Sequence, residues 1–360
     1  MAGIESLAEG RGAFEEISPR CATPACRTEL ITAEELDVPP EDFLGDYCED
    51  SHFYSAFQKS KVPGFEVGYL LIRRGVKRVS VAPFFLMDYR PSLFFDNPSL
   101  QLLFGFLKFK TAFVGHPSAD VGRIDGEISE EVLEAVNDFL STKASLIVYK
   151  FFETALPLHD FFRLSGMPIP ILKVGNDYFS KLHGAEKKHL NREIRLSKEL
   201  EFREVSPAKP SDIPLDEIYR LYLETYHHSD MRFEKLNKDY FIHTLGISSY
   251  LLVYLNGELI GFAQYLTKGN QICGKYLGMN YEKGKPHGLY FGMMLQIIKM
   301  AIRDGFGMID FGVSGYSFKK WLGCQLIPTF VYFRHANPLI NWLLGRFKFL
   351  AEFSETPGNE

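Results

Sequence analysis

Cysteine and tryptophan are scarce in this sequence of 360 residues, which contains five cysteines and two tryptophans. The cysteines are odd in number and lack the paired CxxC spacing that structural zinc sites use. This scarcity points away from a disulfide-stapled secreted scaffold and from a zinc module, and it predicts reduced thiols. The residues concerned are Cys21, Cys26, Cys48, Cys273 and Cys324.

Long apolar runs are also absent. Lys108 and Lys110 interrupt the best candidate, which starts at Leu100, before it reaches the roughly 18 residues of a membrane span. Met1 to Glu16 has no basic region followed by an apolar run, so we expect no secretory signal and a cytoplasmic location. The apolar stretch from Pro338 to Phe353 carries Arg346 and Lys348, which allows a surface-lying amphipathic helix, although a terminal helix packed on the core is favoured.

No excess of positive charge is present. The formal net charge of −5 gives no global attraction to nucleic acid or anionic lipid, so such a partner would need a local basic patch. The composition, 46% hydrophobic and 24% charged, is that of a folded globular protein, and the length suits two packed units.

One hairpin pattern occurs twice, and it gives the first clue to the organisation. Tyr69-Leu70-Leu71-Ile72 is followed by a turn and a second apolar strand, and Tyr250-Leu251-Leu252-Val253 repeats this pattern 181 positions later, with Asn256-Gly257 as its turn. The register holds without a gap between Val79–Phe84 and Ile260–Tyr265. The spacing predicts a duplicated domain.

The rest of the chain is partitioned around this repeat. We expect a leader over 1–44, an N-terminal unit over 45–176, a charged linking helix over 177–211, a C-terminal unit over 212–353 and a tail over 354–360. In the second unit the apolar spacing predicts helices over 215–227 and 234–245, a hairpin over 249–267, a strand over 271–279, a helix over 289–303 and strands over 307–312 and 326–334. The fold class is α/β with mixed sheets.

A basic, glycine-containing loop precedes the 289–303 helix. It runs Tyr281-Glu282-Lys283-Gly284-Lys285-Pro286-His287-Gly288, and the helix behind it would direct unsatisfied N–H groups toward a bound phosphate. Loops of this composition are common at protein surfaces, but the strand over 307–312 follows the helix through Gly305, a suitable C-cap. The segment therefore predicts a strand, phosphate-binding loop, helix and strand in succession.

Three segments carry a resemblance to a known family. The helix end Ala301–Gly305, the Asp310-Phe311-Gly312 strand and the Phe318-Lys319-Lys320-Trp321-Leu322-Gly323 segment together resemble the FemAB-like branch of the GNAT superfamily of N-acyltransferases. Phe318 stands where the family often has tyrosine. The similarity extends to the basic segment Lys187–Arg195 and covers roughly residues 50–335.

The resemblance implies tandem GNAT-like domains, the first of them degenerate, and transfer of an acyl group to an amine of a small molecule or amino acid. The donor would be an acyl-CoA or acyl-carrier-protein thioester lying between the separated strands 271–279 and 307–312. Lys283–Gly288 only approximates the glycine-rich acyl-CoA signature. A Fem-type transferase using aminoacyl-tRNA, and a non-catalytic ligand-binding module, are the alternatives.

Candidate site residues follow from these elements. Asp310, at a strand end, is expected to act as a base or amine anchor, or else to cap a local turn, and Tyr276 or Tyr290 would protonate the leaving group or pack in the core. Backbone N–H groups near Gly278 would bind the oxyanion. The cofactor-binding set is Gly278, Lys283, Gly284, Lys285, His287, Gly288 and Lys319.

Two histidine-containing segments complete the expectations. His227, His228 and Asp230 would line the acceptor side, and no metal is expected, since adjacent histidines on a helix diverge by about 100°. The segment Gly115-His116-Pro117-Ser118-Ala119-Asp120 reads as a turn, with a position in the cleft between the halves as the alternative.

Overall fold

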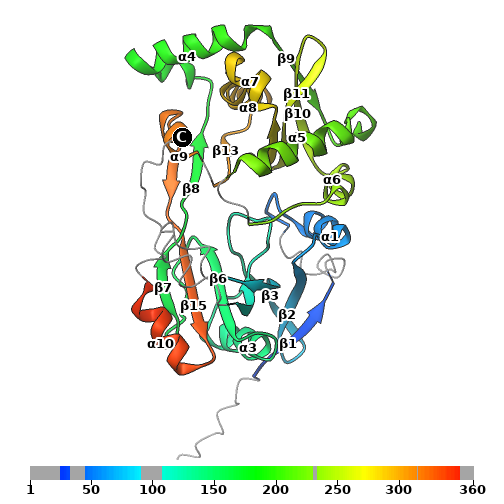
Figure 1. The fold of residues 1–360 in the computed structure, drawn as a ribbon. Helices are drawn as coiled ribbons and strands as arrows, with labels where there is room; N and C mark the ends of the chain where they lie inside the picture. Colours follow the sequence, from blue (N-terminus) through cyan, green and yellow to red (C-terminus); the bar gives the residue numbers. More distant parts are fainter. Residues whose placement is uncertain (1–24, 33–44, 91–107, 230–232, 314, 349–360) are drawn as a thin grey trace, which may run out of the picture.

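Two mixed β-sheets, one in each half of the molecule, form the framework (Figure 1). The structure is a computed structural model that describes residues 25–32, 45–90, 108–229, 233–313 and 315–348. The lower unit in Figure 1 contains the first sheet, and the upper unit contains the second.

The first sheet pairs its strands in the order β1-β2-β3-β4-β6-β15-β7, and β5 adds to β3. Helices α1, α3 and α10 accompany it. The bounds are β1 (Cys26–Ile31), α1 (Ser51–Ser60), β2 (Glu66–Arg74), β3 (Lys77–Tyr89), β4 (Phe109–Val114), β5 (Asp125–Gly126), α3 (Glu130–Ser141), β6 (Leu146–Phe152), β7 (Phe162–Ser165), β15 (Phe330–His335) and α10 (Pro338–Arg346).

The second sheet has the order β14-β8-β13-β12-β11-β10-β9. Its bounds, with the helices of this unit and its short 3-10 turns η3 to η6, are β8 (Ile169–Lys173), η3 (Phe179–Lys181), α4 (Gly184–Leu196), η4 (Ser197–Glu199), β9 (Leu200–Val205), η5 (Pro210–Asp212), α5 (Leu215–His228), α6 (Lys238–Thr244), β10 (Ser249–Leu255), β11 (Glu258–Lys268), β12 (Gln271–Met279), α7 (Tyr281–Gly284), η6 (Lys285–His287), α8 (Leu289–Asp304), β13 (Met308–Asp310), α9 (Tyr316–Trp321) and β14 (Gln325–Ile327).

The two sheets repeat one topology, which confirms the duplication expected from the hairpins. In the first hairpin Leu71 pairs with Val81, and at the same offset Leu252 pairs with Phe262. Each sheet then has one parallel step, from β4 to β6 across α3 and from β12 to β13 across α8. The second hairpin turns through Asn256 and Gly257, both with positive φ, as a two-residue turn requires.

Each unit donates one strand to the sheet of the other. β8 enters the second sheet between β13 and β14, and β15 enters the first sheet between β6 and β7. The strand expected over 326–334 is thus two strands, β14 and β15, in different sheets. The expected leader contains β1, and the expected linking helix ends early, because Leu200–Val205 forms the edge strand β9.

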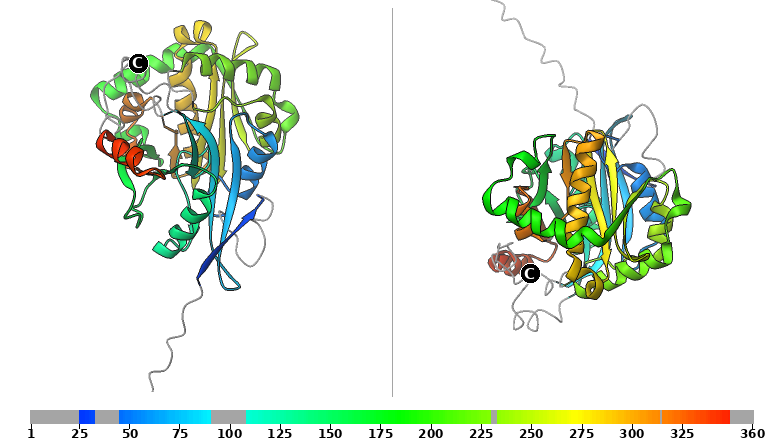
Figure 2. Two further views of the ribbon diagram at one scale, coloured as in Figure 1. Left: turned by 60° about the horizontal axis from the view of Figure 1, so that its bottom comes forward. Right: turned by 90° about the horizontal axis from the view of Figure 1, so that it is seen from above.

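The local sequence explains the main helices. Ser129 caps α3 by accepting from the Val132 N–H, and the acidic first turn Glu130–Glu131 suits a helix start. Gly305 ends α8 in the left-handed conformation, with φ +81°, where a side chain would be strained. Seen from above, α8 runs along the second sheet (Figure 2), and it buries its apolar side chains against that sheet.

A continuous apolar core joins the two units. Phe53 and Tyr54 of α1 belong to the same cluster as Tyr222 of α5, Tyr240 of α6 and Phe262 of β11. A helix long and apolar enough to cross a bilayer does not occur within the described ranges. The shared core fixes the residues that face each other where the two units meet.

Candidate functional site

A β-bulge in β12 directs two polar side chains toward the first unit. Leu277 faces Ala263 and Gly274 faces Tyr265, so Lys275 and Tyr276 both stand opposite Gln264. An extra residue of this kind resets the alternation of a strand, and both side chains accordingly contact groups from the first unit.

Lys275 forms a buried ion pair with Glu49, which lies just before α1. The two side chains are 2% and 4% exposed. The Lys275 Nζ also donates to the Ser118 carbonyl oxygen at 2.6 Å. Burial, the largest single effect, would lower the pKa of Lys275, but the neighbouring acidic groups, Glu49 first and then Cys273 and Asp120, together raise it well above its usual value. The pair therefore places a permanent cation between the units.

Tyr276 is held by residues from both units. Its hydroxyl lies 2.7 Å from Glu234 Oε1 and 3.0 Å from Ser118 Oγ. Burial, followed by the Glu234 carboxylate, raises the pKa of Tyr276 well above its ordinary value. The phenol therefore keeps its proton at neutral pH and donates a hydrogen bond to Glu234.

The segment Gly115–Asp120 lies in this zone between the units. Lys150 Nζ donates to the carbonyl oxygens of Pro117 at 3.1 Å and of Ala119 at 2.8 Å, and the His116 ring stacks on Tyr54 at 4.5 Å between centroids. A cation that holds successive carbonyls fixes the loop. The segment is thus a turn that lies between the halves, and it supplies Ser118 and Asp120 to the site.

Asp310 and Asp120 approach Gly312 from different units. The Gly312 N–H donates to Asp310 Oδ1 at 2.8 Å, and Asp120 Oδ2 lies 3.1 Å from where a Cβ on Gly312 would stand. Burial first, and then the charge of Asp120, raise the pKa of Asp310 to about 7. Burial raises the pKa of Asp120 as well. Two neighbouring carboxyl groups resist being charged together, which keeps a proton exchangeable near neutral pH.

Lys319 braces the turn that follows Asp310. It is 1% exposed, and its Nζ donates to the carbonyl oxygens of Phe311 at 3.0 Å and Gly312 at 2.8 Å. The aromatic-lysine segment that carried the family resemblance therefore orders the backbone beside the carboxyl pair.

β12 and β13 pair only briefly and then separate. Their register comprises Gln271–Met308, Ile272–Ile309 and Cys273–Asp310, after which β13 ends while β12 continues to Met279. The separation implied by the family resemblance therefore begins beside Lys275 and Asp310. Gly278, farther along β12, lies under α5, and a Cβ there would stand 2.6 Å from the backbone of Leu221 and Tyr222.

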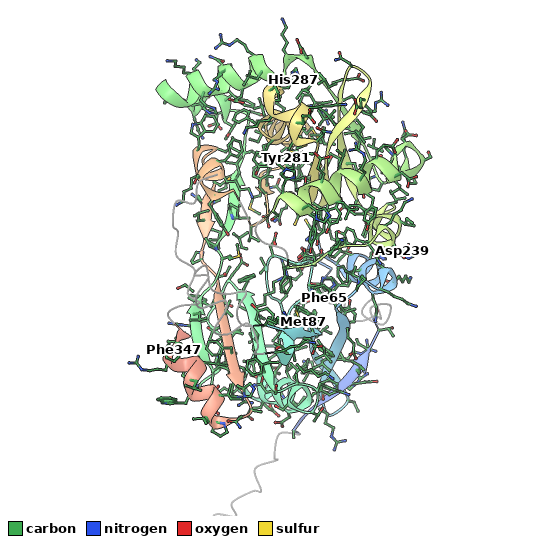
Figure 3. The ribbon with its side chains drawn as sticks, viewed as in Figure 1. Phe65, Met87, Asp239, Tyr281, His287 and Phe347 are labelled. Carbon is green, nitrogen blue, oxygen red and sulfur yellow. The ribbon has the colours of Figure 1, made fainter. Side chains whose placement is uncertain are left out.

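The basic loop before α8 lies apart from this carboxyl pair and is engaged within the protein. Lys283 Nζ pairs with Glu258 at 2.5 Å, and His287 Nδ1 lies 3.4 Å from Glu199. Lys285 is exposed, and Gly284 packs closely on Leu289. Figure 3 shows Tyr281 and His287 at the α7–α8 end of the second unit.

The start of α8 does not suit a pyrophosphate. A Glu193 carboxylate oxygen of α4 lies 2.7 Å from where a Cβ of Gly288 would stand, and Leu196 covers the same glycine. Glu193 is buried, so its carboxylate holds the position that a phosphate would need and would repel one. The residues present at this loop therefore do not fit the phosphate group of a CoA donor.

The remaining candidates lie near the loop or at the end of α5. Tyr290 packs on Phe318 at 5.2 Å, and its hydroxyl lies 3.1 Å from the Cβ position of Gly315, so it adjoins the turn before α9. His228 stacks on Tyr281 at 4.1 Å and its Nδ1–H donates to the Glu224 carbonyl oxygen at 3.0 Å, while His227 contacts Tyr226. Asp230 lies outside the described residues.

The structure thus brings Asp310, Lys319 and Tyr276 to the zone between the units and leaves the expected phosphate loop elsewhere. Sequence reasoning placed Asp120 in a segment that could lie between the halves, but it missed four charged groups of this zone: Glu49, Lys150, Glu234 and Lys275. Lys150 and Lys275 each interrupt an apolar strand, and such an interruption is the signal that could have marked them. No three potential metal ligands cluster in the part of the chain described.

Comparison with known proteins concerns the second unit and the overall fold. Residues 185–320 match the acetyltransferase (GNAT) domain family. Among solved structures, the C-terminal domain of a putative lysylphosphatidylglycerol synthetase from Agrobacterium fabrum aligns with a TM-score of 0.53 and 11% identity over 83% of this chain and 92% of that chain. FemX aligns with a TM-score of 0.50 and 13% identity over 89% of this chain and 100% of that one.

Among curated proteins, no sequence matches this chain. The structural alignments show a shared fold, and at these low identities they show nothing more. The domain match identifies residues 185–320, in the second unit, as an acetyltransferase (GNAT) domain. Residues 185–320 therefore carry a GNAT acetyltransferase domain, and the chain as a whole shares the fold of these solved structures.

Proposed function

We propose that the chain transfers an acyl group to an amine, and that the reaction takes place between the units at Asp310, Asp120 and Tyr276. The observation that carries this proposal is the carboxyl pair beside the point where β12 and β13 separate. A carboxyl group with a pKa of about 7 can take a proton from an ammonium or attacking amine at neutral pH.

The proposed transfer forms one bond, breaks one bond and moves two protons. The amine nitrogen bonds to the acyl carbon, the bond from that carbon to the leaving oxygen or sulfur breaks, and the amine proton passes to Asp310. Tyr276 supplies a proton to the leaving atom, and Glu234 and Ser118 hold its hydroxyl in place. Lys275 and Lys319 offset the negative charge that builds up on the acyl oxygen.

For the donor, we infer an aminoacyl ester of tRNA rather than a CoA thioester. Glu193 at the α8 start disfavours a pyrophosphate there. The side chains of Lys187, Lys188, Arg192 and Arg195 on α4 are exposed, while the Glu193 carboxylate is turned inward. A helix with an exposed basic face suits contact with RNA phosphates.

The decisive assay offers both donors to the purified protein. Aminoacyl-tRNA and a series of acyl-CoAs are each incubated with a broad panel of amines, and formation of the new amide is followed by mass spectrometry. We expect transfer from aminoacyl-tRNA that the Asp310→Asn variant loses. Transfer from acyl-CoA that falls in Lys283→Glu would overturn our choice of donor, and no transfer from either would favour a non-catalytic module.

Charge reversal on α4 tests the RNA contact separately. Lys188→Glu combined with Arg192→Glu, one turn apart on the exposed face, should lower kcat/KM for aminoacyl-tRNA by about tenfold and weaken its salt dependence. Lys143→Glu, an exposed lysine after α3 in the first unit, is the matched control and should change neither.

A further inference from the structure

The outward face of α10 carries an unusual concentration of apolar side chains. Leu339, Trp342, Leu343 and Phe347 are 66%, 60%, 40% and 41% exposed, and their spacing places them on one side of the helix. Ile340 and Leu344, on an adjoining side of the helix, pack against the first sheet. The helix is therefore anchored by one apolar face and presents a second one to the outside.

This stripe is exceptional within the described ranges. The other large exposed apolar side chains are Leu30, Val76, Ile128, Ile194, Phe233 and Ile242, and they belong to separate elements or turns. Scattered apolar side chains need no explanation, but three on one helix and a fourth at its C-cap mark a contact surface. Figure 3 shows Phe347 at the α10 edge of the first unit.

The charges on this segment all have one sign. From Asn337 to Lys348 the sequence contains no acidic residue, and Arg346 and Lys348 are both exposed at its end. Their long aliphatic stems let the charged groups reach outward beside an apolar contact. Exposed tryptophan and long cationic side chains are both groups that favour the interface of a lipid bilayer.

We propose that α10 docks this protein on the surface of a membrane containing anionic lipid. Trp342, Leu339 and Phe347 would enter the boundary between headgroups and acyl chains, and Arg346 and Lys348 would contact lipid phosphates. The helix has nine residues, so it lies along the surface. The overall negative charge of the chain requires this local basic end to supply the attraction to anionic lipid.

The charge pattern favours lipid over a second copy of the chain. Two α10 stripes packed face to face would bring two Arg346 and two Lys348 side chains together with no acidic residue on the segment to pair with them. An anionic bilayer instead complements both the apolar stripe and the cations.

Trp342 provides a built-in probe. The sequence has only two tryptophans, so a Trp321→Phe variant leaves Trp342 as the sole fluorophore. Added to vesicles of equimolar phosphatidylcholine and phosphatidylglycerol, this variant should show a blue-shifted emission that lipids brominated on their acyl chains quench. Pure phosphatidylcholine vesicles should bind more weakly, and Arg346→Glu with Lys348→Glu should remove the difference between the two.

Partition is then measured by vesicle co-sedimentation of the full chain. Trp342→Asp and Leu339→Asp should each lower the partition coefficient at least about tenfold, since each removes apolar area and adds a negative charge. Trp342→Phe should retain most of the binding. Val76→Asp, which alters a 96% exposed side chain in the turn after β2, is the matched control and should have no effect.

Either of two results would overturn the proposal. One is vesicle binding that is absent, or that is unchanged in both aspartate variants. The other is a dimer in light scattering that Trp342→Asp converts to monomer without any vesicle binding, which would make α10 an interface between copies. Both aspartate sites are mostly exposed, so folding of the variants, checked by circular dichroism, should be retained.

Discussion

Asp310 controls the expected pH dependence of the reaction. Because its pKa is raised to about 7, the carboxylate that accepts the amine proton is depleted below neutral pH, so kcat should rise with pH and level off above about 7. Asp310→Asn should lower kcat about 10²–10⁴-fold and abolish this titration. A flat pH profile in the parent chain, or a profile unchanged in Asp310→Asn, would remove Asp310 as the base.

The same raised pKa should lower stability as pH rises. The folded state holds the Asp310 proton that the unfolded state releases from about pH 4, so the stabilisation is complete below that pH and is lost by about pH 7. Its upper limit is about 4 kcal/mol, shared with Asp120. Asp310→Asn should therefore be more stable than the parent at pH 8 in denaturant titrations, and equal stability would contradict this cause.

The Glu49–Lys275 pair should show strong coupling between the units. Lys275→Met leaves a buried carboxylate without a partner and should cost about 3–5 kcal/mol, and the further change Glu49→Gln should recover part of this loss. A double-mutant cycle from urea unfolding measures the coupling. Additive losses would show that each residue is stabilised by other contacts, such as that of Lys275 with Ser118.

Some residues of the site could be named from the sequence, and others could not. Asp310 and Lys319 lie in one short segment whose pattern resembles a family, so they could be named from sequence. Glu49 and Asp120 meet their partners across more than 150 positions, and no local pattern encodes that meeting. Their prediction requires the packing of one unit on the other.

At the scale of elements, the contact of α5 with β12 depends on a missing side chain. Gly278→Ala would place a Cβ 2.3 Å from Phe262 and 2.6 Å from the α5 backbone, so α5 must shift. We expect a loss of about 1–3 kcal/mol in the free energy of unfolding, with reduced activity because Tyr276 lies two residues away. Gly246→Ala is the matched control, since nothing lies within 4 Å of a Cβ there. Equal unfolding midpoints for the two variants would refute the tight contact.

Elements with a strong period could be predicted, and weakly patterned strands could not. The helices α5 and α8 and both hairpins followed from apolar spacing, caps and turns. β9 was predicted as part of the linking helix, because Glu201, Arg203 and Glu204 give this edge strand the composition of a solvent-exposed helix. β15 resembles any apolar strand, and its sheet is decided by partners in the other half of the chain.

For the whole molecule, the duplication could be predicted from the sequence. The exchange of β8 and β15 between the two sheets could not. The pairing register within each hairpin depends on the local alternation of apolar and polar residues, and this alternation is present in both copies. An exchanged strand satisfies the same backbone hydrogen bonds as an unexchanged one, so the pattern of apolar residues is the same in both cases. The exchange nevertheless changes how the protein unfolds.

The exchanged strands and the shared core predict that the two units unfold together. Removing either unit would leave a gap in the sheet of the other and expose Phe53, Tyr240 and their neighbours to water. Trp321 lies in α9 of the second unit and Trp342 in α10 beside the first sheet, so Trp321→Phe and Trp342→Phe each leave a reporter for one unit. Both fluorescence transitions in urea should share one midpoint with far-ultraviolet circular dichroism. Two separated midpoints would show that each unit is stable without the other, and the common core would then contribute little to holding the molecule together.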